Sequence, residues 1–225
     1  MSISAALTTV ACLQFEPVVG AKAHNIALGL KHIEAAAARG AQLIVLPELA
    51  NSGYMFATRA EAFAQAEPVP GGPTCEAWMA AAARLGVTLV AGVAERDGEV
   101  LYNAAVVIGP SGWIGTFRKV HLWNAENLFF EPGNLGFPVF KTPLGRVGVA
   151  ICYDIWFPEV MRTLSSMGAE VLLHPTLTST TDRAAENAIA RATAAQFQCY
   201  VVDVNGLDGG GNGRSVVADP AGNLA

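Results

Sequence analysis

The chain has 225 residues, of which 52% are apolar and 15% are charged, and its formal net charge is −5. This length is enough for one large domain with a sizeable core, and the composition is too apolar for a disordered chain. The acidic charge gives no support to a nucleic-acid partner, and no apolar run reaches the roughly 18 residues of a membrane span.

Strand-like and helix-like patterns alternate along the chain. In chain order, they predict a strand at 8–15, a helix at 25–38, a strand at 42–46, a helix at 74–85, strands at 87–94, 100–108, 113–118 and 146–151, a helix at 158–167, a strand at 170–174, a helix at 183–198, and strands at 200–204 and 216–218. Tight turns link two strand pairs, so we expect an α/β fold with mixed sheets and outer helices, as a single domain over residues 1–225.

The two ends of the sequence and the cysteines give further expectations. Turn residues at 219–222 suggest half of a hairpin, so we expect a chain truncated before a C-terminal strand, with an unpaired sheet edge. The N-terminus lacks the basic region of a secretory signal peptide. Cys12, Cys75, Cys152 and Cys199 are widely spaced, which argues against a disulfide framework or a zinc site and favours reduced thiols in the cytoplasm.

Three ionisable residues follow three predicted strands. Glu48 comes after 42–46, Lys119 directly after 113–118, and Cys152 directly after 146–151. Ligands of open α/β sheets bind outside the strand ends, so these side chains are candidates for one pocket. Cys152 also precedes a helix start, which predicts a sharp turn with the logic of a nucleophile elbow, although the G-x-S-x-G sequence is absent.

Each residue also has a plainer interpretation. Glu48 alone fits a surface loop, Lys119 a solvated basic patch, and Cys152 an inert buried thiol. A cysteine–histidine pair would instead need His121 or His174 beside Cys152 and is the less favoured arrangement. The irregular stretch after Lys119 carries many aromatic residues, and functional residues concentrate in such loops.

Three sequence blocks resemble the signatures of the nitrilase superfamily of carbon–nitrogen hydrolases. They are residues 46–54 (LPELANSGY), 117–122 (FRKVHL) and 148–159 (GVAICYDIWFPE). Residues 122–133 resemble the family segment that carries a second active-site glutamate, and Glu126 fits that position better than Glu131. The likeness runs from about residue 8 to the end. It implies a four-layer α-β-β-α sandwich with two mixed sheets, and a homodimer or a larger homo-oligomer.

The resemblance also implies a Glu-Lys-Cys triad. Glu48 would be the general base, Lys119 the electrostatic stabiliser, and Cys152 the nucleophile that forms a thioester. Lys119 and the backbone N–H of Tyr153 would stabilise the oxyanion, and Glu126 would orient Lys119 or the substrate. The resemblance implies neither a metal nor an organic cofactor.

The residues after the nucleophile bear on the substrate. Nitrile-cleaving members of the superfamily usually have Cys-Trp-Glu, whereas Cys-Tyr-Asp here resembles the amidase and carbamoylase branch. We therefore expect hydrolysis of a small-molecule carboxamide to a carboxylic acid and ammonia. The alternatives are an N-carbamoyl amine or amino acid hydrolase, a nitrilase, and a catalytically silent binding or assembly module. Candidate pocket residues are Tyr54, Phe130, Trp156 and Thr176, and the aromatic ones fit core packing equally well.

Overall fold

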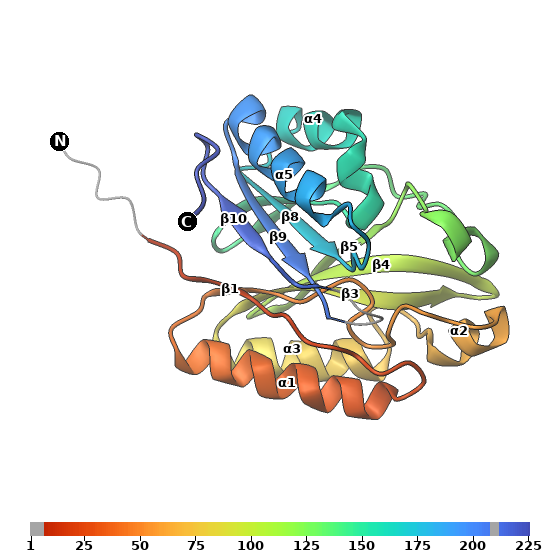
Figure 1. The fold of residues 1–225 in the computed structure, drawn as a ribbon. Helices are drawn as coiled ribbons and strands as arrows, with labels where there is room; N and C mark the ends of the chain where they lie inside the picture. The colour runs from red at the N-terminus through yellow and green to blue at the C-terminus, as the bar shows by residue number, and fades with distance from the viewer. Residues whose placement is uncertain (1–6, 208–211) are drawn as a thin grey trace.

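A computed structural model of the chain describes residues 7–207 and 212–225. The N-terminal residues on which the signal-peptide expectation rests lie outside this range, except for Leu7. The described chain forms two five-stranded sheets that pack face to face, with helices on both outer sides (Figure 1). The predicted four-layer α-β-β-α sandwich with mixed sheets is confirmed.

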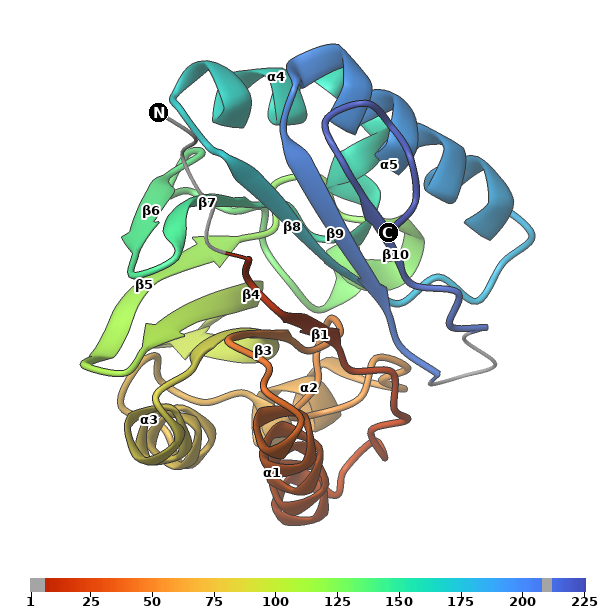
Figure 2. The same ribbon diagram turned by 90° about the vertical axis from the view of Figure 1, so that its left-hand side faces the viewer.

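The first sheet combines parallel and antiparallel strands. Its order is β1 (Val10–Cys12), β2 (Leu43–Val45), β3 (Thr88–Asp97), β4 (Val100–Gly109) and β5 (Gly112–Arg118). The first three strands are parallel and the last two pairings are antiparallel. Two long helices, α1 (Lys22–Ala38) and α3 (Pro73–Leu85), cover its outer face (Figure 2).

The second sheet is mixed in the same way. Its order is β10 (Val216–Ala218), β9 (Tyr200–Asn205), β8 (Val171–Thr176), β7 (Gly145–Val149) and β6 (Val139–Thr142). The pairings of β7, β8 and β9 are parallel, and the edge strands pair antiparallel. Its outer face is covered by α4 (Pro158–Ser166) and α5 (Arg183–Phe197) (Figure 2).

Side-chain alternation along the strands builds three cores between the four layers. On β2, Leu43 and Val45 enter the core between the sheets, while Ile44 enters the core beneath α1 and α3. Because successive side chains of a strand point to opposite faces, a strand buried on both faces is apolar throughout. Phe117 of β5 and Val149 of β7 meet in the same inter-sheet core. The two sheets are therefore fixed against each other by apolar packing.

Several short elements differ from the expectations. The helix α2 (Arg59–Gln65) and the strand β6 were not predicted, since each is brief and partly exposed. A short 3₁₀ helix, η1 (Asn124–Leu128), lies within the stretch predicted as irregular. The strand predicted at 146–151 ends at Val149, because a second 3₁₀ helix, η2 (Cys152–Trp156), begins soon afterwards.

The C-terminal residues complete the predicted turn. Beyond β10, the edge strand, Ala218 pairs with Leu224 in an isolated antiparallel bridge, and the Ala225 amide donates to the Val217 carbonyl at 2.9 Å. The four cysteines all lie within the described residues and are free thiols there. Among the described residues, no helix is long and apolar enough to cross a membrane, and no cluster of potential ligands could hold a metal ion.

Candidate active site

A buried lysine joins two carboxylates beyond the strand ends. Lys119 directly follows β5, and its Nζ lies 2.7 Å from Oε1 of Glu48 and 2.7 Å from Oε1 of Glu126. All three side chains are buried. An ammonium group has three donors, and these contacts use two of them. The structure thus brings three of the predicted site residues into direct contact.

The backbone around Glu48 is held closely against β3. A Cβ on Gly92 of that strand would lie 2.4 Å from the Leu49 nitrogen and 2.5 Å from the Pro47 carbonyl oxygen, so only glycine allows this approach. The Gly92 amide donates to the Pro47 carbonyl at 3.1 Å. Asn103 Nδ2 of β4 also donates to Glu48 Oε1 at 2.7 Å. The other oxygen, Oε2, is buried and has no hydrogen-bond partner within the described residues.

The Glu126 carboxylate is fixed by its own loop. Its Oε2 accepts from the Trp123 amide at 3.0 Å, and the Tyr54 hydroxyl donates to its Oε1 at 2.5 Å. The Glu131 side chain, by contrast, is exposed. The choice of Glu126 over Glu131 therefore agrees with the geometry, since only Glu126 reaches Lys119.

Cys152 is the first residue of η2 and occupies a strained turn that follows β7. Its φ angle is 49°, in the left-handed region that residues other than glycine adopt only at a cost. Asp154, expected as a cap or turn residue, accepts from the Ile151 amide at 3.0 Å through Oδ2 and from the His121 amide at 2.9 Å through Oδ1. The predicted elbow-like turn is thus present, and Asp154 ties it to the segment that follows Lys119.

Burial and neighbouring charges set the protonation of the cluster. Burial and the Glu48 charge raise the pKa of Cys152 well above its usual value, although Lys119 opposes them. Burial also raises the pKa of Glu48, against the effects of Lys119 and Asn103. Burial alone would lower the pKa of Lys119, but the charge of Cys152 in its thiolate form and the charges of the two glutamates raise it well above its usual value. These shifts favour a protonated thiol on Cys152 and a charged ammonium on Lys119.

A cavity of about 470 Å³ opens onto Cys152. Two of the predicted pocket residues, Tyr54 and Trp156, line it together with Trp123. Its ionisable wall residues besides Cys152 and the tyrosines are Asp182 and Glu186. The volume suits a small organic molecule.

Residues 9–225 match the sequence profile of the family described as carbon-nitrogen hydrolase. The chain belongs to the carbon–nitrogen hydrolase family. This confirms the resemblance to the nitrilase superfamily drawn from the three sequence blocks.

Relatives of this carbon–nitrogen hydrolase carry several activity names. A protein named nitrilase from Pyrococcus abyssi is 49% identical over 169 residues, which cover 75% of this chain and 64% of that protein. An N-carbamoylputrescine amidase from Solanum lycopersicum is 38% identical over 177 residues, covering 76% of this chain and 58% of that protein. The chain thus covers less than two thirds of these curated relatives.

Solved structures share the fold of this carbon–nitrogen hydrolase. Nit3 of Saccharomyces cerevisiae, described as a member of branch 10 of the nitrilase superfamily, superposes with a TM-score of 0.86 at 26% identity, covering 97% of this chain and 84% of that chain. An amidase from Nesterenkonia sp. gives a TM-score of 0.83 at 24% identity, covering 96% and 84% respectively.

Two predicted pocket residues do not line the cavity of this carbon–nitrogen hydrolase. Phe130 packs against Phe56 in a core cluster, with ring centroids 6.0 Å apart. Thr176 is fully buried, and its hydroxyl donates to Glu186 Oε1 at 3.2 Å. The expectation for these two is corrected, since Phe130 belongs to the core and Thr176 supports a wall residue from behind.

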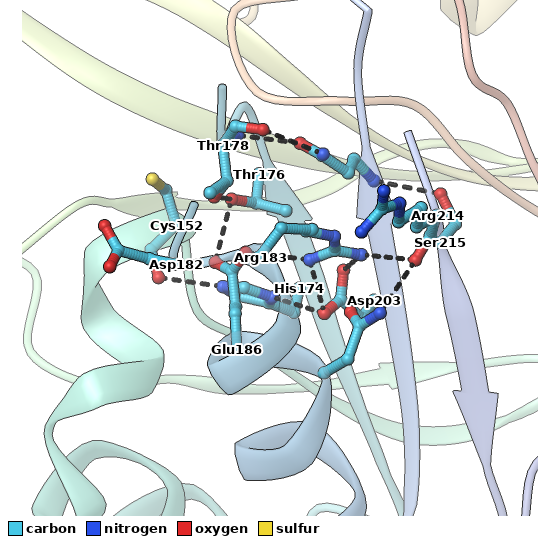
Figure 3. A network of polar contacts seen from close by, with 12 residues as sticks. Cys152, His174, Thr176, Thr178, Asp182, Arg183, Glu186, Asp203, Arg214 and Ser215 are labelled. Atoms are coloured by element: carbon cyan, nitrogen blue, oxygen red, sulfur yellow. Dashed lines mark hydrogen bonds and ion pairs between the residues drawn. The ribbon is translucent and has the colours of Figure 1, made fainter. Parts of the chain in front are cut away.

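Asn103 and Asp203 were not predicted as site residues, and His174 was considered only as an alternative partner of Cys152. Asn103, His174 and Asp203 each interrupt an apolar run within a strand. A buried polar group needs a hydrogen-bond partner, so this interruption is a signal that sequence alone could have supplied. His174 Nε2 lies 2.9 Å from the Cys152 carbonyl oxygen, whereas the Cys152 sulfur points away from the ring (Figure 3). His121 Nδ1 contacts Asp154 instead, at 2.8 Å, so neither histidine is placed as the predicted alternative required.

Proposed function

We propose that this protein hydrolyses a small carboxamide to a carboxylic acid and ammonia through a thioester on Cys152. The observation that carries the proposal is the buried Lys119 held between Glu48 and Glu126, next to a cavity-lining thiol on a left-handed turn. A thiol, a carboxylate and a fixed cation are the parts that nucleophilic acyl transfer needs.

The first step needs a base. Burial and the Glu48 charge raise the pKa of Cys152, which favours the thiol over the thiolate, so a base has to take its proton during the attack. As Sγ attacks the amide carbon, Glu48 accepts the thiol proton. Its buried Oε2 has no partner among the described residues and is free to take that proton. The attack moves the carbonyl π electrons onto oxygen and produces a tetrahedral oxyanion.

Lys119 stabilises that oxyanion. Its ammonium keeps one donor beyond those used by the two glutamates, and its raised pKa keeps it charged. The backbone N–H of Tyr153, at the start of η2, is the proposed second donor. Loss of one such donor costs about 3–4 kcal/mol of transition-state stabilisation. Glu126 orients Lys119.

Glu48 then acts as a general acid and donates the proton that it accepted from the thiol. It returns the proton to the amide nitrogen as the carbon–nitrogen bond breaks, which releases ammonia and leaves the Cys152 thioester. A water molecule gives a proton to Glu48 and attacks the thioester carbon. Collapse of the second tetrahedral intermediate returns that proton to Sγ and releases the carboxylic acid.

The charge of the cavity wall limits the acyl group. Asp182 and Glu186 line the cavity, and no lysine, arginine or histidine lines it among the described residues. Glu186 is paired with the buried Arg183 at 2.8 Å, whereas Asp182 is exposed. A carboxylate on the substrate would meet like charge without a compensating cation. We therefore propose a neutral or amine-bearing substrate.

The second candidate is hydrolysis of an N-carbamoyl amine. It is favoured by the same acidic wall, and by the similarity to a protein named N-carbamoylputrescine amidase. The chemistry differs only in the group attached to the reacting carbon, so both candidates use Glu48, Lys119 and Cys152 alike. The similarity to a protein named nitrilase makes a nitrile the third compound type to test.

A matched substrate panel tests the proposal. Pentanamide, 5-aminopentanamide and 4-carbamoylbutanoate differ at the far end in charge, and an N-carbamoyl amine and a nitrile complete the panel. Ammonia release should be faster for the first two compounds than for the carboxylate. Cys152→Ala should abolish release, whereas Cys199→Ala, a buried thiol outside the cavity wall, should retain it. Wild-type release by Cys152→Ala would refute the mechanism, and no release from any compound would favour the silent binding module.

Two expectations drawn from the sequence and the resemblance stay predictions. We propose a homodimer or a larger homo-oligomer, and a location in the reducing cytoplasm, which is consistent with four free thiols. Light scattering of the purified protein measures the oligomeric state, because the mass of a homo-oligomer should be a multiple of 23.5 kDa.

A further inference from the structure

A second buried network adjoins Cys152, and the proposed mechanism does not use it (Figure 3). It joins His174 of β8, Asp203 of β9 and Arg183 at the start of α5. All three side chains are at most 1% exposed. Buried charges contribute little net stability compared with apolar residues of the same volume, so their presence beside a nucleophile calls for another explanation.

His174 acts on the backbone of Cys152. Its Nε2 lies 2.9 Å from the carbonyl oxygen, and a carbonyl only accepts, so Nε2 carries the proton. The φ angle of 49° at Cys152 has to be maintained by surrounding contacts. The hydrogen bond from His174 restrains one side of this turn, and Asp154 restrains the other through the Ile151 amide.

Arg183 fixes Asp203, which lies beside His174. Asp203 Oδ2 is 3.6 Å from His174 Nδ1, an ion-pair distance rather than a hydrogen bond, and Nδ1 is buried without a hydrogen-bond partner among the described residues. The two Asp203 oxygens accept from Arg183 at 2.8 and 3.0 Å. Arg183 also donates to Glu186 Oε2 at 2.8 Å and to the backbone carbonyls of residues 213–214 at 3.1 and 2.8 Å. These contacts use all five N–H groups of the guanidinium, which is therefore fixed in position.

We propose that His174, held by Asp203 and Arg183, is a positioning residue that keeps the Cys152 turn in its left-handed conformation and so aims Sγ into the cavity. The same arginine holds Glu186, a wall residue, so one anchor fixes both the nucleophile and part of the wall. The inference rests on the proposed role of Cys152 but not on any particular substrate.

Two substitutions separate positioning from packing. His174→Phe fills the space of the ring without an N–H, whereas His174→Gln keeps a side-chain N–H donor. His174→Phe should slow both Cys152 alkylation by iodoacetamide and kcat by about ten- to a hundredfold, while KM stays within about twofold. His174→Gln should restore most of both rates. Peptide mass spectrometry measures alkylation at Cys152, and steady-state kinetics on a responsive amide gives kcat and KM.

Glu67→Gln is the matched control. Glu67 is also buried, and it accepts from the Thr74 amide at 2.8 Å at the start of α3, in the opposite outer layer. The Glu67→Gln variant should have a lower unfolding free energy, but its Cys152 should be alkylated at the wild-type rate. A wild-type alkylation rate in folded His174→Phe, or an equal slowing by Glu67→Gln, overturns the inference. Alkylation requires no turnover, so it decides the matter even if no amide is hydrolysed.

A measurement that leaves His174 in place covers the case in which His174→Phe does not fold. Nitrogen-15 NMR of histidine-labelled protein distinguishes protonated from unprotonated ring nitrogens. The chain has four histidines, so substitution of the other three in turn assigns the His174 signals. We expect a protonated Nε2, and an unprotonated Nε2 would overturn the inference.

Discussion

Glu48 presents two chemically different oxygens to the site. Oε1 accepts from both Lys119 and Asn103 at 2.7 Å, whereas the buried Oε2 has no partner among the described residues. One oxygen therefore fixes the carboxylate in place, and the other is available for proton transfer. Burial raises the pKa of Glu48, so it gains a proton at a less acidic pH than an ordinary glutamate.

The variant Asn103→Leu tests whether the two oxygens of Glu48 have these separate roles. The Asn103 hydrogen bond lowers the pKa of Glu48, so its removal should raise that pKa further. The carboxylate is the active form and is lost as pH falls through the pKa, so the acid limb of kcat/KM should move to higher pH. Asn134→Leu is the control, because Asn134 contacts Arg118 and Tyr102 instead of Glu48. An acid limb that does not move in Asn103→Leu would show that another group sets it.

At the scale of elements, the site depends on how closely the segment after β2 lies on β3. Gly92 leaves room for the backbone of residues 47–49, and Leu49 has a φ angle of 48°. The atoms that a Cβ would meet belong to the backbone and cannot rotate away. A change on β3 is therefore transmitted to Glu48 through main-chain displacement.

Gly92→Ala should both destabilise the fold and reduce activity. Overpacking against rigid backbone costs about 1–3 kcal/mol of unfolding free energy. Displacement of Glu48 should also lower kcat by up to about a hundredfold. Gly71→Ala is the matched control, because a Cβ there meets nothing within 4 Å. Urea unfolding and amide turnover measure the two effects, and unchanged turnover in Gly92→Ala would contradict the coupling.

At the scale of the whole molecule, the reacting groups come from both sheets. Glu48 and Lys119 follow strands of the first sheet, whereas Cys152 follows β7 of the second. The distance between base and nucleophile is thus set by the packing of one sheet on the other. The inter-sheet core, with Phe117 fully buried within it, maintains that packing.

Phe117→Ala should weaken this packing. Loss of a buried phenyl ring costs about 3–5 kcal/mol of unfolding free energy. Trp113→Ala, on the same strand but 45% exposed, should cost less than about 1 kcal/mol. Chemical denaturation followed by tryptophan fluorescence or circular dichroism measures both. Equal costs for the two variants would contradict the assignment of Phe117 to the core that joins the sheets.

The sequence predicted the layers more fully than the site. Continuous apolar runs identified β2, β3 and β4, because strands buried on both faces have no polar side. Glu48, Lys119 and Cys152 were found because they follow such runs. The partners of these residues were not found, because the pairing of Asn103 with Glu48 joins residues 55 positions apart and depends on sheet register. Phe130 was misplaced because the path of its loop is set by tertiary contacts with Phe56.

Arg183 contacts residues 20 to 31 positions later in the sequence, and this has a consequence for biosynthesis. A ribosome releases the N-terminal part first, so Cys152 emerges well before Asp203 and the carbonyls of residues 213–214. The contacts that hold His174 cannot form until those late residues have been made. A nascent chain therefore carries its thiol for a period without the complete anchor, and a chain stalled before residue 213 has the reactive atom but lacks the full restraint on its turn.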